Sequence, residues 1–416
     1  MADAGVTVPR TAWLQQPDHV AWLREQTRLQ LVFGRRFLHP EGGAWYLDDD
    51  GEPDQTRPVS TWITARMAHV YSLGHLAGLP GCLPSATRAI EGLMGRLHDD
   101  EHGGWFTSLG PGEGERDGTK AGYAHAFVVF ASSSAAVAGV PGARSLLDDA
   151  LGVLDRRFWE EAPGLHADSA ERDWSAVSRY RGLNANMHSV EALLSAADTT
   201  GDPRWCERAA RITTTVLGWA AENGWRIPEH FDERWTPVLE HHRDQPDHPF
   251  EPYGATVGHG LEWARLALHV RAAMGGGAPA GLLEGARGLF ERAVEDGWAV
   301  DGADGFVYTT DWTGVPVVRQ RMHWVVAEAI SAAAALWKAT GELAYDRWYR
   351  TWWDYADRYV VTDDGSWRHE LDPWNEPART VWPGRPDLYH SLHAVLLGRL
   401  PLAPSAPTAL AHGSLA

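Results

Sequence analysis

The stretch Gly103-Gly104-Trp105-Phe106-Thr107, followed by the apolar run GYAHAFVVFASSSAAVA at residues 122–138, contains the two elements that decide the fold. In the first, glycines precede aromatic and β-branched residues, a pattern typical of a short strand or hairpin. In the second, apolar residues cover most sides of a helix, which indicates a buried helix. Glycine–aromatic segments recur roughly every sixty residues with one wider gap, and such a period indicates a repeat architecture. The other segments are residues 42–47, 164–168, 224–228, 305–309 and 365–369.

Between these segments the periodicity becomes helical, and two kinds of helix alternate along the chain. A helix with a charged stripe belongs at the surface, whereas a helix that is apolar on most sides belongs in the interior. The charged-faced helices are predicted at residues 22–32, 86–97, 146–158, 204–220, 282–294 and 345–361. The apolar helices are predicted at residues 59–76, 122–138, 183–197, 256–273, 322–339 and 388–400.

Six charged-faced and six apolar helices in alternation predict an all-α protein, an (α/α)6 barrel with the apolar helices as its inner ring. The strand-like segments then form short β-hairpins at one end, and the loops gather at a single mouth. No Pro/Gly/Ser-rich linker interrupts the pattern, so residues 1–416 are expected to form one catalytic domain. Residues 401–416 read as a loose C-terminal tail.

Charge and composition exclude several classes of partner. The formal net charge of −18 lacks the excess of Lys and Arg with which proteins bind nucleic acid or anionic membranes, so a neutral small molecule is the expected partner. No stretch approaches the roughly 20 apolar residues of a membrane span, and the start of the chain has no signal-peptide pattern. Cys82 and Cys206 are not spaced like metal ligands or a redox pair, so we expect both to be buried and reduced, as in a cytoplasmic protein. We expect the protein to be a monomer or a homodimer.

Polar residues inside the apolar helices are the candidates for chemistry, because burying a polar group without a partner costs free energy. Several histidines at similar depth favour an acid–base site, and His188, His259 and His390 are the strongest candidates. The interpretation leaves His69 and His125 open and assigns His323 to packing. The remaining polar or aromatic residues of these helices are Trp62, Arg66, Tyr123, Asn184, Glu191, Glu262, Glu328 and Asp387.

Structural roles compete with these functional ones. Glu191 and Glu328 can act as partners that fix histidine tautomers, and Arg66 can serve only to pair with a carboxylate. Helix N-termini carry partial positive charge, so helix starts gathered at one mouth would favour an anionic intermediate.

Other chemistries remain open at this point. His259 and Glu262 lie on one helix face at a spacing that suits a metal, although the H-E-x-x-H signature is absent. Glycoside hydrolysis needs two carboxylates across the scissile bond, but histidines outnumber carboxylates here. A non-catalytic sugar-binding barrel would also bind sugar with aromatic side chains, but it would not need acid–base histidines.

Five ordered motifs carry a family resemblance that covers the chain from about Trp13 to Leu400. They start at Ser60-Thr61-Trp62, Asn184-Ala185-Asn186-Met187-His188, Gly258-His259-Gly260-Leu261-Glu262, Met322-His323-Trp324 and Pro386-Asp387-Leu388-Tyr389-His390. In these motifs the chain resembles the N-acylglucosamine 2-epimerase superfamily, and especially its aldose–ketose isomerase branch, which includes mannose isomerases and sulfoquinovose isomerase. The final Asp-Leu-Tyr-His resembles that branch rather than the N-acylglucosamine or cellobiose 2-epimerases.

The resemblance implies a site without metal or cofactor that binds one monosaccharide. It implies that His259 and His390 are the acid–base pair. It also implies that the sugar is held by Trp62, Arg66, Asn184, His188, Glu262 and Glu328. Tyr123, which lies at the start of the second inner helix, is expected to bind the sugar with them.

The expected reaction interconverts an aldose and its ketose, first of all D-mannose and D-fructose. One histidine opens the pyranose ring, and a base moves a proton from C2 to C1 through a cis-enediol, for which a side chain with a pKa of about 6.5 is suited. Arg66 would stabilise the charge that develops on O1 or O2. The sequence does not decide which histidine performs which step, and 2-epimerisation starts from the same enediol.

Overall fold

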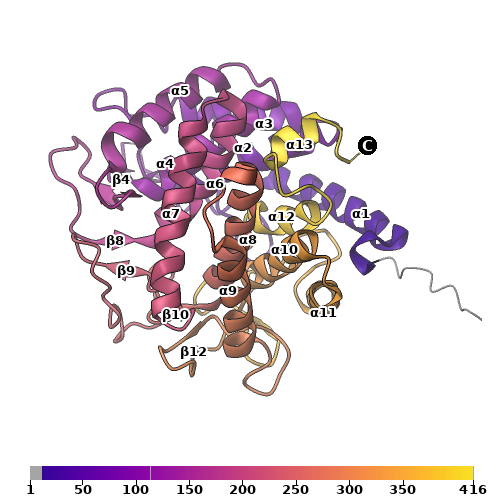
Figure 1. Ribbon diagram of the computed structural model, residues 1–416. Helices are drawn as coiled ribbons and strands as arrows, with labels where there is room; N and C mark the ends of the chain where they lie inside the picture. The colour runs from indigo at the N-terminus through magenta and orange to yellow at the C-terminus, as the bar shows by residue number, and fades with distance from the viewer. Residues whose placement is uncertain (1–11, 113, 416) are drawn as a thin grey trace, which may run out of the picture.

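In residues 12–112 and 114–415, which the computed structural model describes, the chain forms thirteen α-helices joined by loops with very short strands (Figure 1). The inner helices are buried on nearly all sides, because apolar residues occupy nearly all of their faces. They are α2 (Thr61–Leu76), α4 (Gly122–Val137), α6 (Leu183–Thr200), α8 (Val257–Met274), α10 (His323–Thr340) and α12 (Tyr389–Leu397). The outer helices are α1 (Pro17–Phe33), α3 (Cys82–Met94), α5 (Ala143–Val153), α7 (Pro203–Glu222), α9 (Leu282–Gly297) and α11 (Leu343–Tyr359).

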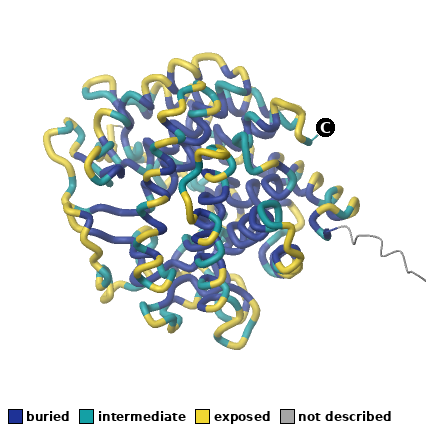
Figure 2. Tube along the Cα trace, in the orientation of Figure 1, coloured by how far each residue is buried: buried dark blue, intermediate teal, exposed yellow. Residues whose placement is uncertain are grey.

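The inner helices form a closed ring. Each contacts the next along the chain, and α12 contacts α2. Each outer helix packs against the inner helix that precedes it, from α3 on α2 to α11 on α10, while α1 packs on α12. Buried residues follow the inner ring, and exposed residues follow the outer helices and loops (Figure 2). This is the (α/α)6 barrel that the alternation of helices predicts.

Two-residue strands mark one end of the barrel. Those that directly precede an inner helix are β1 (Val59–Ser60), β4 (Lys120–Ala121), β8 (Arg181–Gly182), β10 (Ala255–Thr256) and β13 (Arg321–Met322). They pair antiparallel with β2 (Ser108–Leu109), β7 (Ser169–Ala170), β9 (His230–Phe231), β11 (Thr309–Thr310) and β14 (Glu370–Leu371) respectively, and ahead of α12 Arg385 pairs with Leu47. The other strands are β3 (Arg116–Asp117), β5 (Trp159–Glu160), β6 (Leu165–His166), β12 (Pro316–Val318) and β15 (Pro377–Ala378). The pairings therefore gather the loops at the N-terminal ends of the inner helices.

Most of the glycine–aromatic segments form the predicted tight turns. One is the β5–β6 hairpin, and the others are single antiparallel pairs, Leu38 with Ala44, His98 with Trp105, Trp298 with Phe306 and Val361 with Trp367. Residues 224–228, all described, form no strand. Trp225 there has a left-handed backbone with φ of 66°, which is incompatible with extended pairing.

Three predictions about chain segments need correction. Helix α1 begins five residues earlier than predicted, at Pro17, because proline suits the first turn of a helix. The predicted helix at residues 146–158 ends at Val153 and continues as a π-helical turn, Leu154–Phe158. The loose tail is wrong for the described residues, because α13 (Ala406–Ala411) buries Pro407, Ala409 and Leu410 and contacts α2, α4 and α6.

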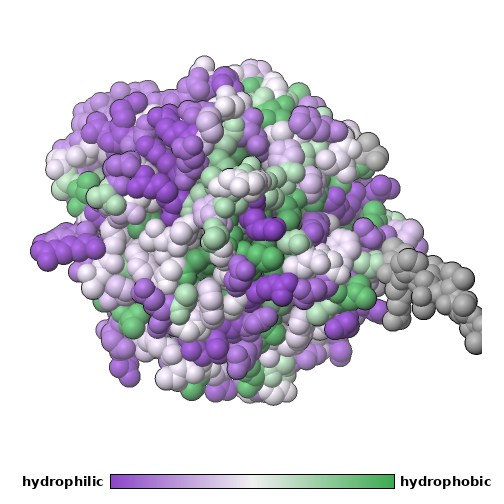
Figure 3. Space-filling model, viewed as in Figure 1, coloured by the Kyte–Doolittle hydropathy of each residue, from purple (hydrophilic) through white to green (hydrophobic). Residues whose placement is uncertain are grey.

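The exterior of the molecule is the polar, charged surface that the charged-faced outer helices predict. The face in Figure 3 is largely hydrophilic, with hydrophobic residues in separate patches. None of the helices in the described part of the chain is both long and apolar enough to cross a membrane. Both cysteines are free, as predicted, although Cys206 is only half-buried.

Candidate active site

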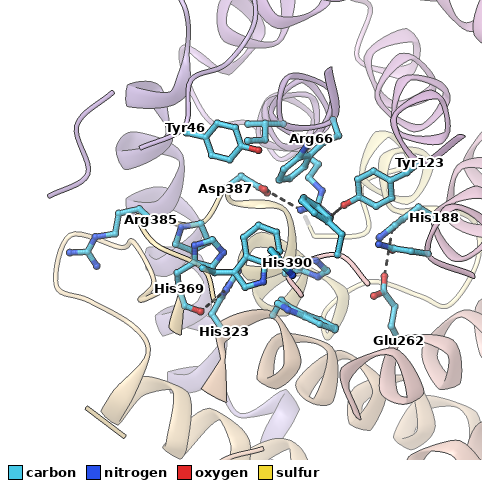
Figure 4. Close-up of a pocket in the computed structure, with 18 of the residues that line it drawn as sticks. Tyr46, Arg66, Tyr123, His188, Glu262, His323, His369, Arg385, Asp387 and His390 are labelled. Carbon is cyan, nitrogen blue, oxygen red and sulfur yellow. Dashed lines mark hydrogen bonds and ion pairs between the residues drawn. The ribbon is translucent and has the colours of Figure 1, made fainter. Parts of the chain in front are cut away.

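A cavity that is open to solvent lies at the end of the barrel where the inner helices begin (Figure 4). Side chains from the first turns of α2, α4, α6, α8, α10 and α12 line it, and loops complete its rim. Of the predicted site residues it brings together Trp62, Arg66, Tyr123, Asn184, His188, His259, Glu262 and His390. The cavity is therefore the place where the sequence motifs meet.

His259 and His390 have the same arrangement on two different helices. His259 Nδ1 is 2.6 Å from Glu229 Oε2, and His390 Nδ1 is 2.9 Å from Glu328 Oε1. A carboxylate on Nδ1 holds the proton there in the neutral ring and leaves Nε2 as the basic nitrogen. Both imidazoles are thus oriented and tautomerically fixed in the way that acid–base catalysis requires.

Glu328 lies differently from the sugar-binding position predicted for it. It is fully buried on α10 and is not among the described residues that line the cavity. Its carboxylate bonds His390 on one oxygen and Arg265 Nε, at 2.9 Å, on the other. This geometry favours the alternative that the sequence left open, in which Glu328 positions His390.

Trp324 packs beside both catalytic candidates. Its ring centroid lies 5.1 Å from that of His259 and 5.7 Å from that of His390. A Cβ at Gly258 would come within 2.3 Å of the Trp324 ring, so the glycine before His259 allows the indole to reach this position. Packing of Trp324 thus explains why a glycine directly precedes His259 in this motif.

Arg66 provides fixed positive charge at the cavity wall. Its guanidinium lies 3.1 Å from Asp387 Oδ2 and donates to the Tyr123 hydroxyl at 2.9 Å (Figure 4). Its carbon Cζ also lies 4.8 Å from the Trp62 ring centroid. Because these contacts hold the group in one place, Arg66 is preorganised to stabilise an oxyanion.

Among the described residues that line the cavity, several have a buried polar atom without a hydrogen-bond partner, including Asn184 and His188. Within the described part of the chain, neither Asn184 Oδ1 nor His188 Nδ1 has a hydrogen-bond partner, and Glu262 Oε1 is 3.9 Å from that nitrogen. Buried polar atoms normally find a partner, so these atoms are suited to sugar hydroxyls. A sugar-binding role of Asn184, His188 and Glu262 stays a prediction that this geometry permits.

Beneath the cavity, Arg265 of α8 lies among three carboxylates. Its nitrogens are 2.9 Å from Glu328, 3.2 Å from Glu191 and 3.4 Å from Glu262, and all four side chains are almost fully buried. Glu191 also accepts a hydrogen bond from the Tyr389 hydroxyl. Burial, reinforced by the neighbouring Glu328, raises the pKa of Glu262 well above its ordinary value.

The same arrangement bears on the metal alternative. Glu262 belongs to two groups of potential ligand atoms, one with His188 and Glu191, the other with Glu328 and His390. Arg265 already occupies the centre of these carboxylates, and its charge would repel a cation there. His259, the other half of the predicted metal pair, is bound to Glu229 instead. The donor set therefore favours acid–base chemistry.

Burial also acts on the histidines of the cavity. It lowers the pKa of His188, His323 and His390 well below the usual value, and the charge of Arg66 acts in the same direction. These rings are therefore neutral near pH 7, and a neutral ring can accept a proton.

Several residues lie in other places than the sequence predicts, and some cavity residues carry no signal in the sequence. His323, assigned to packing, lines the cavity, whereas His69 and His125 lie outside it, bonded to Ser134 and to Trp105 respectively. Asp387 accepts from the Tyr389 backbone at the start of α12 and also lines the wall. The residues that were missed lie mainly outside the inner helices, in loops or in the recurring glycine–aromatic segments, which predict turns and not site residues. They include Tyr46, Arg57, Phe250, Tyr308, His369, Trp382 and Arg385.

Comparison with known proteins places the chain in a family. The family model N-acylglucosamine 2-epimerase (GlcNAc 2-epimerase) matches residues 42–394. A D-mannose isomerase of Thermobifida fusca is 50% identical, covering 96% of this chain and 99% of its own length, and one of Pseudomonas cannabina pv. alisalensis is 45% identical, covering 96% and 97%. A crystal structure of D-mannose isomerase superposes with a TM-score of 0.85 at 27% identity, covering 93% of this chain and 98% of that one. The chain belongs to the N-acylglucosamine 2-epimerase family.

Proposed function

We propose that this protein is a D-mannose isomerase, an intramolecular oxidoreductase that interconverts D-mannose and D-fructose. Full-length relatives at 45% and 50% identity bear that name. The observation that carries the proposal is the pair His259 and His390 at one cavity, each with a buried carboxylate on Nδ1. This pair supplies what a proton transfer between adjacent carbons needs, an oriented base and an oriented acid.

The chemistry of the cavity wall supports isomerisation over hydrolysis. The acidic residues among its described lining are Glu262 and Asp387, and Asp387 is engaged by Arg66 and by the start of α12. A glycosidase would need two carboxylates free to act on either side of a glycosidic bond. No serine or cysteine nucleophile appears among the described lining residues.

The proposed reaction begins with ring opening. One histidine of the pair moves a proton from the anomeric hydroxyl to the ring oxygen, which releases the open-chain aldose. A base Nε2 then removes the C2 proton, electrons shift to O1, and a proton that the acid of the pair donates to O1 completes the cis-enediol. The base returns its proton to C1 while the O2 hydroxyl gives its proton back to the deprotonated acid, which yields the ketose with atoms and electrons balanced and no cofactor. Arg66 would stabilise the charge on O1 or O2.

The lowered pKa of His390 predicts where its contribution to the pH profile lies. Below that pKa the ring is protonated and cannot act as a base, and above it the ring is neutral and active. The fall in kcat/KM that protonation of His390 causes should therefore occur below pH 6.5. A titration of ¹³C-labelled histidines by NMR, with His390→Gln to assign the signal, checks this. A His390 signal that titrates above pH 6.5 would contradict it.

The substrate is tested by product analysis on a panel of sugars. D-mannose, cellobiose, N-acetylglucosamine and sulfoquinovose are incubated with the purified protein, and the products are separated by chromatography. We expect fructose from D-mannose as the dominant reaction, with glucose as a minor product of the shared enediol. A 2-epimer as the main product, or turnover of another sugar in preference to mannose, would overturn the proposal.

We also propose that the chain acts as a single catalytic domain in the cytoplasm, as a monomer or homodimer, and without metal or cofactor. The closed inner ring, from α2 to α12, supports the first point. The two free cysteines support the second.

A further inference from the structure

The loop between β9 and β10 forms part of the cavity rim. Pro249, Phe250 and Pro252 from this loop line the cavity, and the Phe250 ring contacts Trp62 and Trp382 at centroid distances of 6.3 Å and 5.0 Å. Despite these two contacts, Phe250 is 43% exposed. The conformation of the loop therefore helps to shape the mouth through which a sugar enters.

Three side chains with metal-ligating atoms meet at the outer part of this loop. His241 Nε2 is 2.8 Å from Glu251 Oε2, and His242 Nδ1 is 3.8 Å from the same oxygen. One ligand atom from each of these residues lies within 4.8 Å of those of the other two. The three side chains are about a quarter to a third exposed, at 26% for His242 and 33% for Glu251, so an ion from solvent can reach them.

We infer that His241, His242 and Glu251 form a binding site for a divalent transition metal such as Zn²⁺. Two imidazoles and a carboxylate are a ligand set that Zn²⁺ accepts, with water in the remaining position. Tetrahedral ligands at 2.0–2.1 Å from the ion lie about 3.3 Å apart, close to the present separations. His242 Nδ1 lies 2.8 Å from the Glu251 carbonyl oxygen and would exchange that contact for the ion. In the metal-free protein a proton bridges His241 and Glu251, and the ion would take its place.

Neighbouring groups hold the ligands close to this arrangement. The His241 ring stacks on Tyr180 at a centroid distance of 5.3 Å, and His242 lies 4.6 Å from the His248 ring. The backbone N–H of Glu251 donates to His248 Nδ1 at 3.0 Å. Such outer contacts orient ligands and limit the entropy lost when a metal binds.

The position of the site gives it a consequence for the cavity. Glu251 lies between Phe250 and Pro252, which line the cavity, whereas His241 and His242 lie ten and nine residues away along the same loop. A metal that joins them would cross-link the two arms of the loop and fix its conformation. The site is distinct from His259 and His390, which the proposed isomerisation uses.

The direct test is a calorimetric titration of chelator-treated, tag-free protein with ZnCl2. We expect one ion per chain, with affinity reduced at least about tenfold in His241→Ala and in Glu251→Gln. His412→Ala, which removes an exposed histidine of the C-terminal segment, is the matched control and should bind as the native protein does.

A second readout reports the cross-link itself. Arg243 follows His242 directly and its side chain is 71% exposed, so trypsin can cleave the loop there. Zn²⁺ should slow this cleavage in the native protein and in His412→Ala but not in His241→Ala. Absence of saturable binding, or equal loss of binding in His241→Ala and His412→Ala, would overturn the inference. Neither readout involves sugar turnover, so failure here is distinct from failure of the proposed isomerase function.

Discussion

Replacing either His259 or His390 by alanine should lower kcat for D-mannose by at least about two orders of magnitude. Each imidazole is aligned by a carboxylate on Nδ1, Glu229 for His259 and Glu328 for His390, and the substitution removes an aligned Nε2 from the cavity wall. The effect should fall on kcat more than on KM, because the proton is transferred only after the sugar binds. Steady-state kinetics with a coupled fructose assay measure both.

Two controls make this result interpretable. His75→Ala changes a half-buried histidine at the far end of α2, outside the cavity, and should keep near-native turnover. Circular dichroism and the thermal midpoint show whether each variant remains folded. A His259→Ala or His390→Ala protein that is folded and keeps near-native kcat would remove that residue from the mechanism.

Replacing Arg265 by methionine should lower the free energy of unfolding by about 3–5 kcal/mol. The substitution leaves Glu191, Glu262 and Glu328 buried together with no positive charge among them. Breaking a buried ion pair from one side is costly, because the remaining charge loses both water and its partner. Protonation of Glu262, whose pKa is already raised, would relieve only part of the repulsion.

Urea unfolding at pH 7 measures this loss. Arg144→Met on the exposed face of α5 is the matched control and should change stability by no more than about 0.5 kcal/mol. Adding Glu262→Gln to Arg265→Met should restore part of the stability, because it removes one of the carboxylate charges. A loss below about 1 kcal/mol in Arg265→Met would show that the network is not held by this arginine.

The architecture could be predicted because its signals are local. Each inner helix is apolar over most of its surface, as in residues 122–138, and each outer helix carries a charged stripe, so the alternation is visible without tertiary information. The loose tail failed as a prediction because α13 is short. Its few apolar residues become meaningful only when α2, α4 and α6 lie beside it.

The residues of the candidate site likewise fall into those that the sequence reveals and those that it does not. Residues in the first turns of the inner helices, such as Arg66 and His188, are polar in an apolar setting and so could be recognised. Arg265 meets the same criterion, because it is a charged residue in an apolar helix, but it was not among the predicted site residues. Glu229 comes from a loop without a periodic signal, and the recurring segment that contains His369 predicts a turn and not a site. Only the strand pairings bring the two residues beside α8 and α10.

The role of Glu328 could not be fixed from the sequence for a related reason. It lies five residues after His323 on α10, which cannot reveal that it faces α12 and His390. Its helix face follows from how α10 is rotated within the ring, which depends on packing against α8 and α12. The choice between contact with the sugar and support of a histidine thus required the structure.

The most direct test of the account is incubation with D-mannose in D2O, with and without EDTA, followed by NMR. We predict that fructose appears at equal rates in both samples. Deuterium should enter C1 of fructose and C2 of recovered mannose, because the histidine that carries the proton exchanges it with solvent. Deuterium at these positions would show a proton transfer through an enediol directly, whereas loss of fructose formation in EDTA would contradict metal-free catalysis by His259 and His390.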